Sequence, residues 1–195
     1  MKKIYIVLAH TGTILSRIIK MKTGAEYTHS SIALDEDLKK MYSFGRKYPY
    51  IAFIGGFVRE GADFGTFKRF YNTEISVYEV EVSEEQYKSV CETIEYVKEH
   101  KDEYRFNILG LFLAGFNKRR KVAKTYYCAE FVKAVLEKSK IDTTGLPEII
   151  KPEHFKDIKN SKLIYKGLLK EYKKKTKFMD NLLEFMLSKK ASNIK

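Results

Sequence analysis

The feature that most constrains this chain is a set of short runs rich in Ile, Val and Tyr, each ended by polar residues or glycine. Such residues favour extended backbone, and the lengths of the runs are typical of strands. In the run over 75–82, apolar and polar residues alternate from Val77 onward, which predicts a strand with one buried face. Asp35-Glu36-Asp37 predicts a turn that pairs the second and third runs as a hairpin. The predicted strands are 3–9, 28–34, 39–44, 75–82 and 163–168.

Two helices are predicted between these strands. The first begins at Ser83, because Ser83-Glu-Glu-Gln86 is a capping box and apolar residues then recur at helical spacing. Cys91 lies in that apolar stripe, so we interpret it as a small core side chain. The second helix follows Thr125, whose hydroxyl is predicted to cap it. An amphipathic pattern predicts a further short helix over residues 14–21.

Composition limits the class of protein. In 195 residues, 44% are apolar, enough for the core of one domain. Two cysteines exclude a disulfide scaffold and a four-thiolate zinc site, and no metal-binding spacing or glycine-rich phosphate loop is present. We therefore expect no cofactor. The apolar runs over 4–9 and 106–116 are too short for a signal peptide and a membrane span, which favours a cytoplasmic protein.

Chemistry could come from Cys128 and a histidine. Cys128 follows the predicted cap closely, and the amides and dipole of a helix start stabilise a thiolate. It could equally be the first residue of an apolar core stripe. His29, in the second predicted strand, could be a base facing a cleft or a polar edge residue. His100 and His154 are interpreted as surface residues, and the sequence does not place His10.

Four short sequence segments, taken in their order along the chain, resemble the motifs of a known family. They are Tyr27-Thr-His29-Ser-Ser-Ile-Ala-Leu-Asp35, Tyr104-Arg-Phe-Asn-Ile-Leu-Gly110, Tyr126-Tyr-Cys128-Ala-Glu-Phe-Val132 and Leu163-Ile-Tyr165-Lys-Gly167. Together they resemble the circularly permuted papain-like branch of the NlpC-type cell-wall peptidase superfamily. The resemblance is greatest to its YiiX/YaeF-like group, with lecithin:retinol acyltransferase as a more distant relative. In that branch the histidine strand precedes the nucleophile helix, and the matches are spread over residues 4–172.

The resemblance implies an α+β, permuted papain-like (NlpC-type) domain over 1–172, with a mostly antiparallel sheet and the nucleophile helix packed on it. It implies a cysteine hydrolase (peptidase or amidase) or acyltransferase, with Cys128 as nucleophile and His29 as base. The third member, which orients His29, is predicted to be Ser43, with Glu60 as the alternate. Tyr127 could shape the pocket or pack under the helix. A small-molecule, peptide or lipid substrate would form a thioacyl intermediate on Cys128.

The net charge of +12 indicates either an acidic partner or a role in solubility. The charge is unevenly distributed along the chain. Residues 173–195 carry +5 and an apolar cluster, which predicts a basic amphipathic tail. This tail could lie on an anionic membrane or pack back on the domain. The run 106–116, followed by basic residues, could form a lipid-facing lip or a buried helix. The basic clusters are not visibly joined, which argues against nucleic acid. The alternative function is therefore a non-catalytic binding module that docks on an anionic membrane or an acidic partner through the tail.

Overall fold

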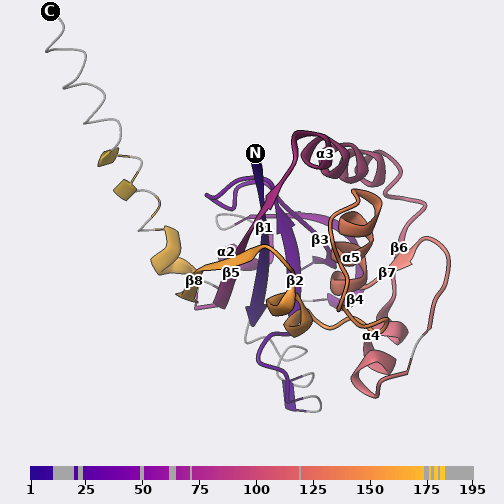
Figure 1. The fold of residues 1–195 in the computed structure, drawn as a ribbon. Coiled ribbons are helices and arrows are strands. Elements are labelled where there is room, and N and C mark those ends of the chain that lie inside the picture. Colours follow the sequence, from indigo (N-terminus) through magenta and orange to yellow (C-terminus); the bar gives the residue numbers. More distant parts are fainter. Residues whose placement is uncertain are drawn as a thin grey trace, which may run out of the picture.

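The computed structural model describes residues 1–10, 20–21, 24–48, 51–61, 65–70, 72–118, 120–173, 176, 178–179 and 181–182. Its centre is a six-stranded sheet in the order β4-β3-β2-β1-β5-β8, in which every neighbouring pair is antiparallel (Figure 1). A separate parallel pair joins β6 and β7. The fold is thus α+β with a mostly antiparallel sheet, as predicted. The strands are β1 Lys2–His10, β2 His29–Ala33, β3 Met41–Tyr48, β4 Ile51–Glu60, β5 Glu74–Val82, β6 Arg105–Phe106, β7 Thr125–Tyr126 and β8 Ser161–Leu168.

The five predicted strands are confirmed, and β2 and β3 form the predicted antiparallel pair. Strand β4 was not predicted, because Gly55-Gly56 resembles the punctuation between elements. In the structure these glycines lie inside a paired strand, opposite Arg46 and Gly45 of β3. A Cβ on Gly55 would lie 2.7 Å from the Phe106 ring, so the glycine permits close packing of β6 against β4.

The sheet is buried on both faces. One face packs against α5 (Cys128–Lys138), α3 (Glu84–Glu99) and the 3-10 helix η1 (Pro152–Asp157), which lie on one side of it in Figure 1. Ile6, Phe44 and Phe131 belong to this larger core. The opposite face holds a smaller core that includes Phe67 of α2 (Gly65–Arg69) and Tyr172.

The helix that begins after Ser83 is α3, and its capping box is confirmed. The Ser83 hydroxyl accepts from the Gln86 amide at 3.1 Å, and the Gln86 side chain accepts from the Ser83 amide at 2.9 Å. Cys91 is only half-buried and lies at the edge of the stripe rather than in the core. The short helix predicted over 14–21 lies outside the described residues, apart from 20–21.

The predicted cap at Thr125 is wrong. Thr125 belongs to β7, and its hydroxyl donates to the Val122 carbonyl at 2.7 Å. Helix α5 begins at Cys128, with Tyr127 as the N-cap residue, and the Glu130 carboxylate accepts from the Tyr127 amide at 3.1 Å. None of the helices in the described ranges is both long and apolar enough to cross a membrane.

Candidate active site

The imidazole of His29 lies at the start of β2, in the middle of the sheet. Its strand pairs with β1, where Ala9 lies opposite His29, and with β3. Gly45 of β3 lies beside the ring, since a Cβ there would be 3.4 Å from His29 Cε1 and 3.6 Å from Glu60 Oε1. The His29 side chain is 17% exposed and that of Glu60 is 8% exposed, so the two groups interact with little screening by water.

Glu60 holds one nitrogen of this ring. Both carboxylate oxygens of Glu60 lie 3.0 Å from His29 Nε2. Ser31, which shares a face of β2 with His29 because strand side chains alternate, donates its hydroxyl to Glu60 Oε2 at 2.6 Å. The same hydroxyl lies 3.3 Å from His29 Nε2. Side chains from β2 and β4 thus hold the ring through Nε2, and the other nitrogen, Nδ1, is left for a further partner.

The Cys128 thiol is near enough to His29 to influence the pKa of its imidazole. Burial of the imidazole is the largest single influence on its pKa and acts to lower it. The Glu60 charge, the hydrogen bonds with Cys128 and Glu60, and the Cys128 charge together outweigh burial and raise the pKa of His29 from 6.5 to about 10. At neutral pH the ring is therefore an imidazolium between two groups that can carry negative charge.

The start of α5 is fixed by a polar network. The Glu130 carboxylate, which accepts from the Tyr127 amide, also accepts from the Asn107 side chain at 3.3 Å. Asn107 is the N-cap of α4 (Ile108–Gly115), and its oxygen accepts from the Gly110 amide at 2.9 Å. A Cβ on Gly110 would lie 2.2 Å from the Asn107 amide nitrogen, which explains the glycine in this segment. The network links the segment around Asn107 to the helix that carries Cys128.

Of the other predicted site residues, neither Ser43 nor Tyr127 hydrogen bonds to His29 among the described contacts. The Ser43 hydroxyl is fully buried and donates to the Ser30 carbonyl at 2.7 Å. Glu60, the alternate third member, is the group in contact with the ring. The sequence patterns favour Ser43 over Glu60, because they predict a strand for Ser43 and none over Ile51–Glu60. The Tyr127 hydroxyl donates to the Ile150 carbonyl at 2.8 Å, and its side chain is packed in the core.

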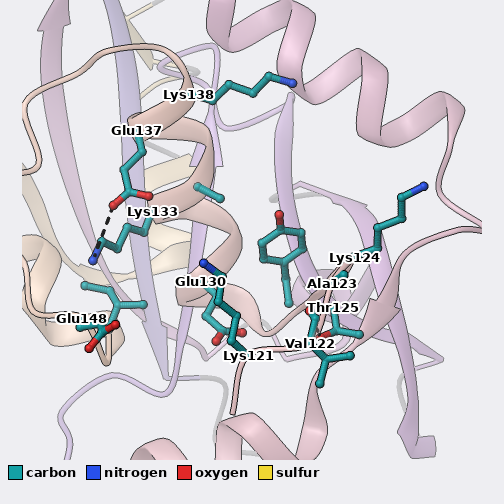
Figure 2. Close-up of a pocket in the computed structure, with 13 residues that line it drawn as sticks. Lys121, Val122, Ala123, Lys124, Thr125, Glu130, Lys133, Glu137, Lys138 and Glu148 are labelled. Carbon is teal, nitrogen blue, oxygen red and sulfur yellow. Dashed lines mark hydrogen bonds and ion pairs between the residues drawn. The ribbon is translucent and has the colours of Figure 1, made fainter. Parts of the chain in front are cut away.

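A hollow of about 720 Å³ lies on the outer side of α5, and neither His29 nor Cys128 lines it (Figure 2). Its walls come from residues 121–126, from the outward side chains of α5, and from Glu148 and Ile150. Lys133 pairs with Glu137 across one helical turn there. Within the described ranges, no group of three or more His, Cys, Asp or Glu side chains is arranged to hold a metal ion.

No family model matches the chain, and no curated protein matches it significantly. Among solved structures, the chain is similar to the crystal structure of metalloprotein yiiX from Escherichia coli O157:H7. The TM-score is 0.48 at 15% sequence identity, and the match covers 86% of this chain and 98% of that chain.

Proposed function

We propose that this protein is a thiol hydrolase, or an acyltransferase, of the permuted papain-like class, with Cys128 as the nucleophile. The observation that supports the proposal is that the Glu60 carboxylate holds the His29 ring, while the nearby Cys128 thiol raises the pKa of the same ring. A nucleophile, a base and a group that orients the base are the three parts of such a site. The order of the chain, with the histidine strand before the cysteine helix, agrees with the permuted arrangement.

In the proposed mechanism, the Cys128 sulfur reacts beside an imidazolium. The raised pKa of His29 keeps its ring protonated at pH 7. The positive charge of this ring and the first turn of α5, where Cys128 lies, both favour negative charge developing on the sulfur. Glu60 and Ser31 hold the ring in this orientation, because both contact Nε2.

The reaction proceeds in two halves. The Cys128 thiolate attacks the carbonyl carbon of an amide or ester, a C–S bond forms, and the C–N or C–O bond breaks. The imidazolium of His29 gives its proton to the leaving group. In the second half the neutral imidazole takes a proton from water, or from an acceptor alcohol or amine, as that molecule attacks the thioacyl carbon and the thiolate is released. Amides at the start of α5, including that of Cys128, are unpaired within the helix and suit the developing oxyanion.

The chain carries its own control for a test of the activated thiol. Cys91 is half-buried, and burial, the main influence, raises the pKa of its thiol. With iodoacetamide at mildly acidic pH, we expect Cys128 to be alkylated at least about tenfold faster than Cys91, because the thiolate is the reactive form. Mass spectrometry of tryptic peptides gives both rates in one sample. The His29→Ala variant should lose the selectivity for Cys128.

A second measurement follows the thioacyl intermediate. An activated ester such as p-nitrophenyl acetate should acylate Cys128, and the Cys128→Ser variant should show no thioester on this peptide. Release of the acyl group to water indicates a hydrolase, and faster release to an added amine or alcohol indicates an acyltransferase. If Cys128 is alkylated no faster than Cys91 in the folded protein, the chain is better described as a non-catalytic binding module of this fold.

A further inference from the structure

Helix α4 presents an apolar side to water. Leu109 and Phe112 are 47% and 43% exposed, and Phe116, at the end of the helix, is 70% exposed. Their spacing of three and four residues places them on one side of the helix, while Gly110 and Ala114 face inward and are buried. Large apolar side chains are usually buried in a helix of a water-soluble domain, so this clustered exposure indicates a contact surface.

Basic residues lie in the segment that follows these apolar side chains. Residues 105–129 hold six Lys or Arg and no Asp or Glu. The chain after α4 folds back along it, because the Lys118 amide donates to the Leu113 carbonyl at 2.9 Å and the Asn107 side chain donates to the Arg120 carbonyl at 3.1 Å. Lys118, Arg120 and Lys121 are exposed, and α4 and the loop that follows it lie at one side of the molecule in Figure 1.

We propose that this surface docks on an anionic lipid bilayer. We name it the α4 surface, made of Leu109, Phe112, Phe116, Lys118, Arg120 and Lys121. Exposed Phe and Leu can enter the headgroup region, and adjacent Lys and Arg attract acidic headgroups. The absence of acidic residues from 105–129 suits this partner, since a protein partner is usually met by charges of both signs.

The location of the α4 surface gives it a connection to the proposed site. Asn107 caps α4 and also donates to Glu130, which holds the first turn of α5, where Cys128 lies. Docking would therefore hold the nucleophile helix at a fixed position relative to the bilayer. The docking itself does not depend on Cys128 chemistry, and binding can be measured in the Cys128→Ser variant.

The test is sedimentation of the full-length protein with vesicles of phosphatidylcholine, with and without phosphatidylglycerol. We expect binding to the anionic vesicles that weakens with salt. Each basic residue near such a surface contributes roughly a fivefold factor, so Lys118→Gln/Arg120→Gln/Lys121→Gln should lower the partition coefficient on the order of 100-fold. Phe116→Ser should lower it about tenfold or more, since the buried aromatic area is lost.

Two control variants distinguish the α4 surface from exposed apolar residues elsewhere on the molecule. Leu163→Ser removes an apolar side chain of β8 that is 47% exposed, the same fraction as Leu109. This variant should leave binding unchanged. Phe178→Ser/Met179→Ser alters the exposed apolar residues of the tail, and binding lost only in this variant would assign docking to the tail instead. Thermal melts confirm that each variant is folded. Absence of binding to anionic vesicles, equal binding to neutral ones, or α4-dependent self-association in gel filtration would overturn the proposal.

Discussion

Replacing Glu60 by glutamine removes the charge beside His29 while keeping a side chain of similar shape. The raised pKa of His29, about 10 against an ordinary 6.5, corresponds to roughly 5 kcal/mol of preference for the protonated ring in the folded protein. The Cys128 charge shares in this figure. Two unit charges 3 Å apart attract by about 5 kcal/mol at an effective dielectric constant of about 20, and burial of the ring offsets part of it. We therefore expect Glu60→Gln to lower the free energy of unfolding at pH 7 by about 2–3 kcal/mol.

The dependence on pH distinguishes this effect from a loss of packing. Because the pKa of His29 is raised on folding, its stabilisation is fully present below pH 6.5 and is lost as the pH rises to about 10. Urea unfolding across this range, in a Cys128→Ser background that isolates the His29–Glu60 pair, should give a free energy that falls with pH. In the Glu60→Gln variant burial dominates the pKa of the ring, so the fall should disappear. An NMR titration of the His29 ring protons gives the pKa directly.

Glu26 provides the matched control. Its carboxylate pairs with Lys156 and Lys166 at the surface, and hydrogen bonds from these two lysines lower its pKa to about 2. A lowered carboxyl pKa adds stability that is lost only as the pH falls. Glu26→Gln should therefore lower stability at neutral pH and above by less than about 1 kcal/mol, because the pair is exposed to water, and this effect should fade only in acid, leaving the dependence between pH 6.5 and 10 unchanged. If Glu60→Gln keeps the same loss of stability between pH 6.5 and 10, the reasoning about the His29–Glu60 pair is refuted.

Three further variants test the local contacts. Gly110→Ala should destabilise the protein by about 2 kcal/mol in urea unfolding, because the added Cβ would meet the Asn107 side chain. In an Asn107→Ala background the cost of the same substitution should fall below about 1 kcal/mol. If the costs of the two substitutions simply add in the double variant, the proposed clash is contradicted. Ser83→Ala removes the cap of α3 and should cost about 1 kcal/mol, with an unchanged rate of Cys128 alkylation. Ser31→Ala should lower the pKa of His29 and slow alkylation in acid by a few fold, since the hydroxyl holds the Glu60 carboxylate; an unchanged pH profile would leave Ser31 without a positioning role.

Some features of this protein were determined by the sequence because they depend on neighbouring residues. The capping box at Ser83 closes within four residues, and the alternation after Val77 is a local consequence of strand geometry. The segment around Asn107 is local in the same sense, since its side chain caps α4 three residues before Gly110. The capping box and the strand were predicted correctly. The cap at Thr125 was not, because the hydroxyl bonds backward to Val122 and a carboxylate from the helix serves α5 instead.

The composition of the candidate site was decided only by the tertiary structure. His29 and Glu60 are separated by 31 positions in the chain, and they meet because β4 pairs with β3 and β3 pairs with β2. Strand β4 contains two glycines that look like a loop in the sequence, and the one at Gly55 is explained by the approach of Phe106. Ser43 lies on the adjacent strand but bonds to the main chain. Sequence alone indicated Cys128 and His29 as candidates, whereas the partner of the imidazole followed from the order of the strands, because sheet pairing joins residues that no local pattern connects.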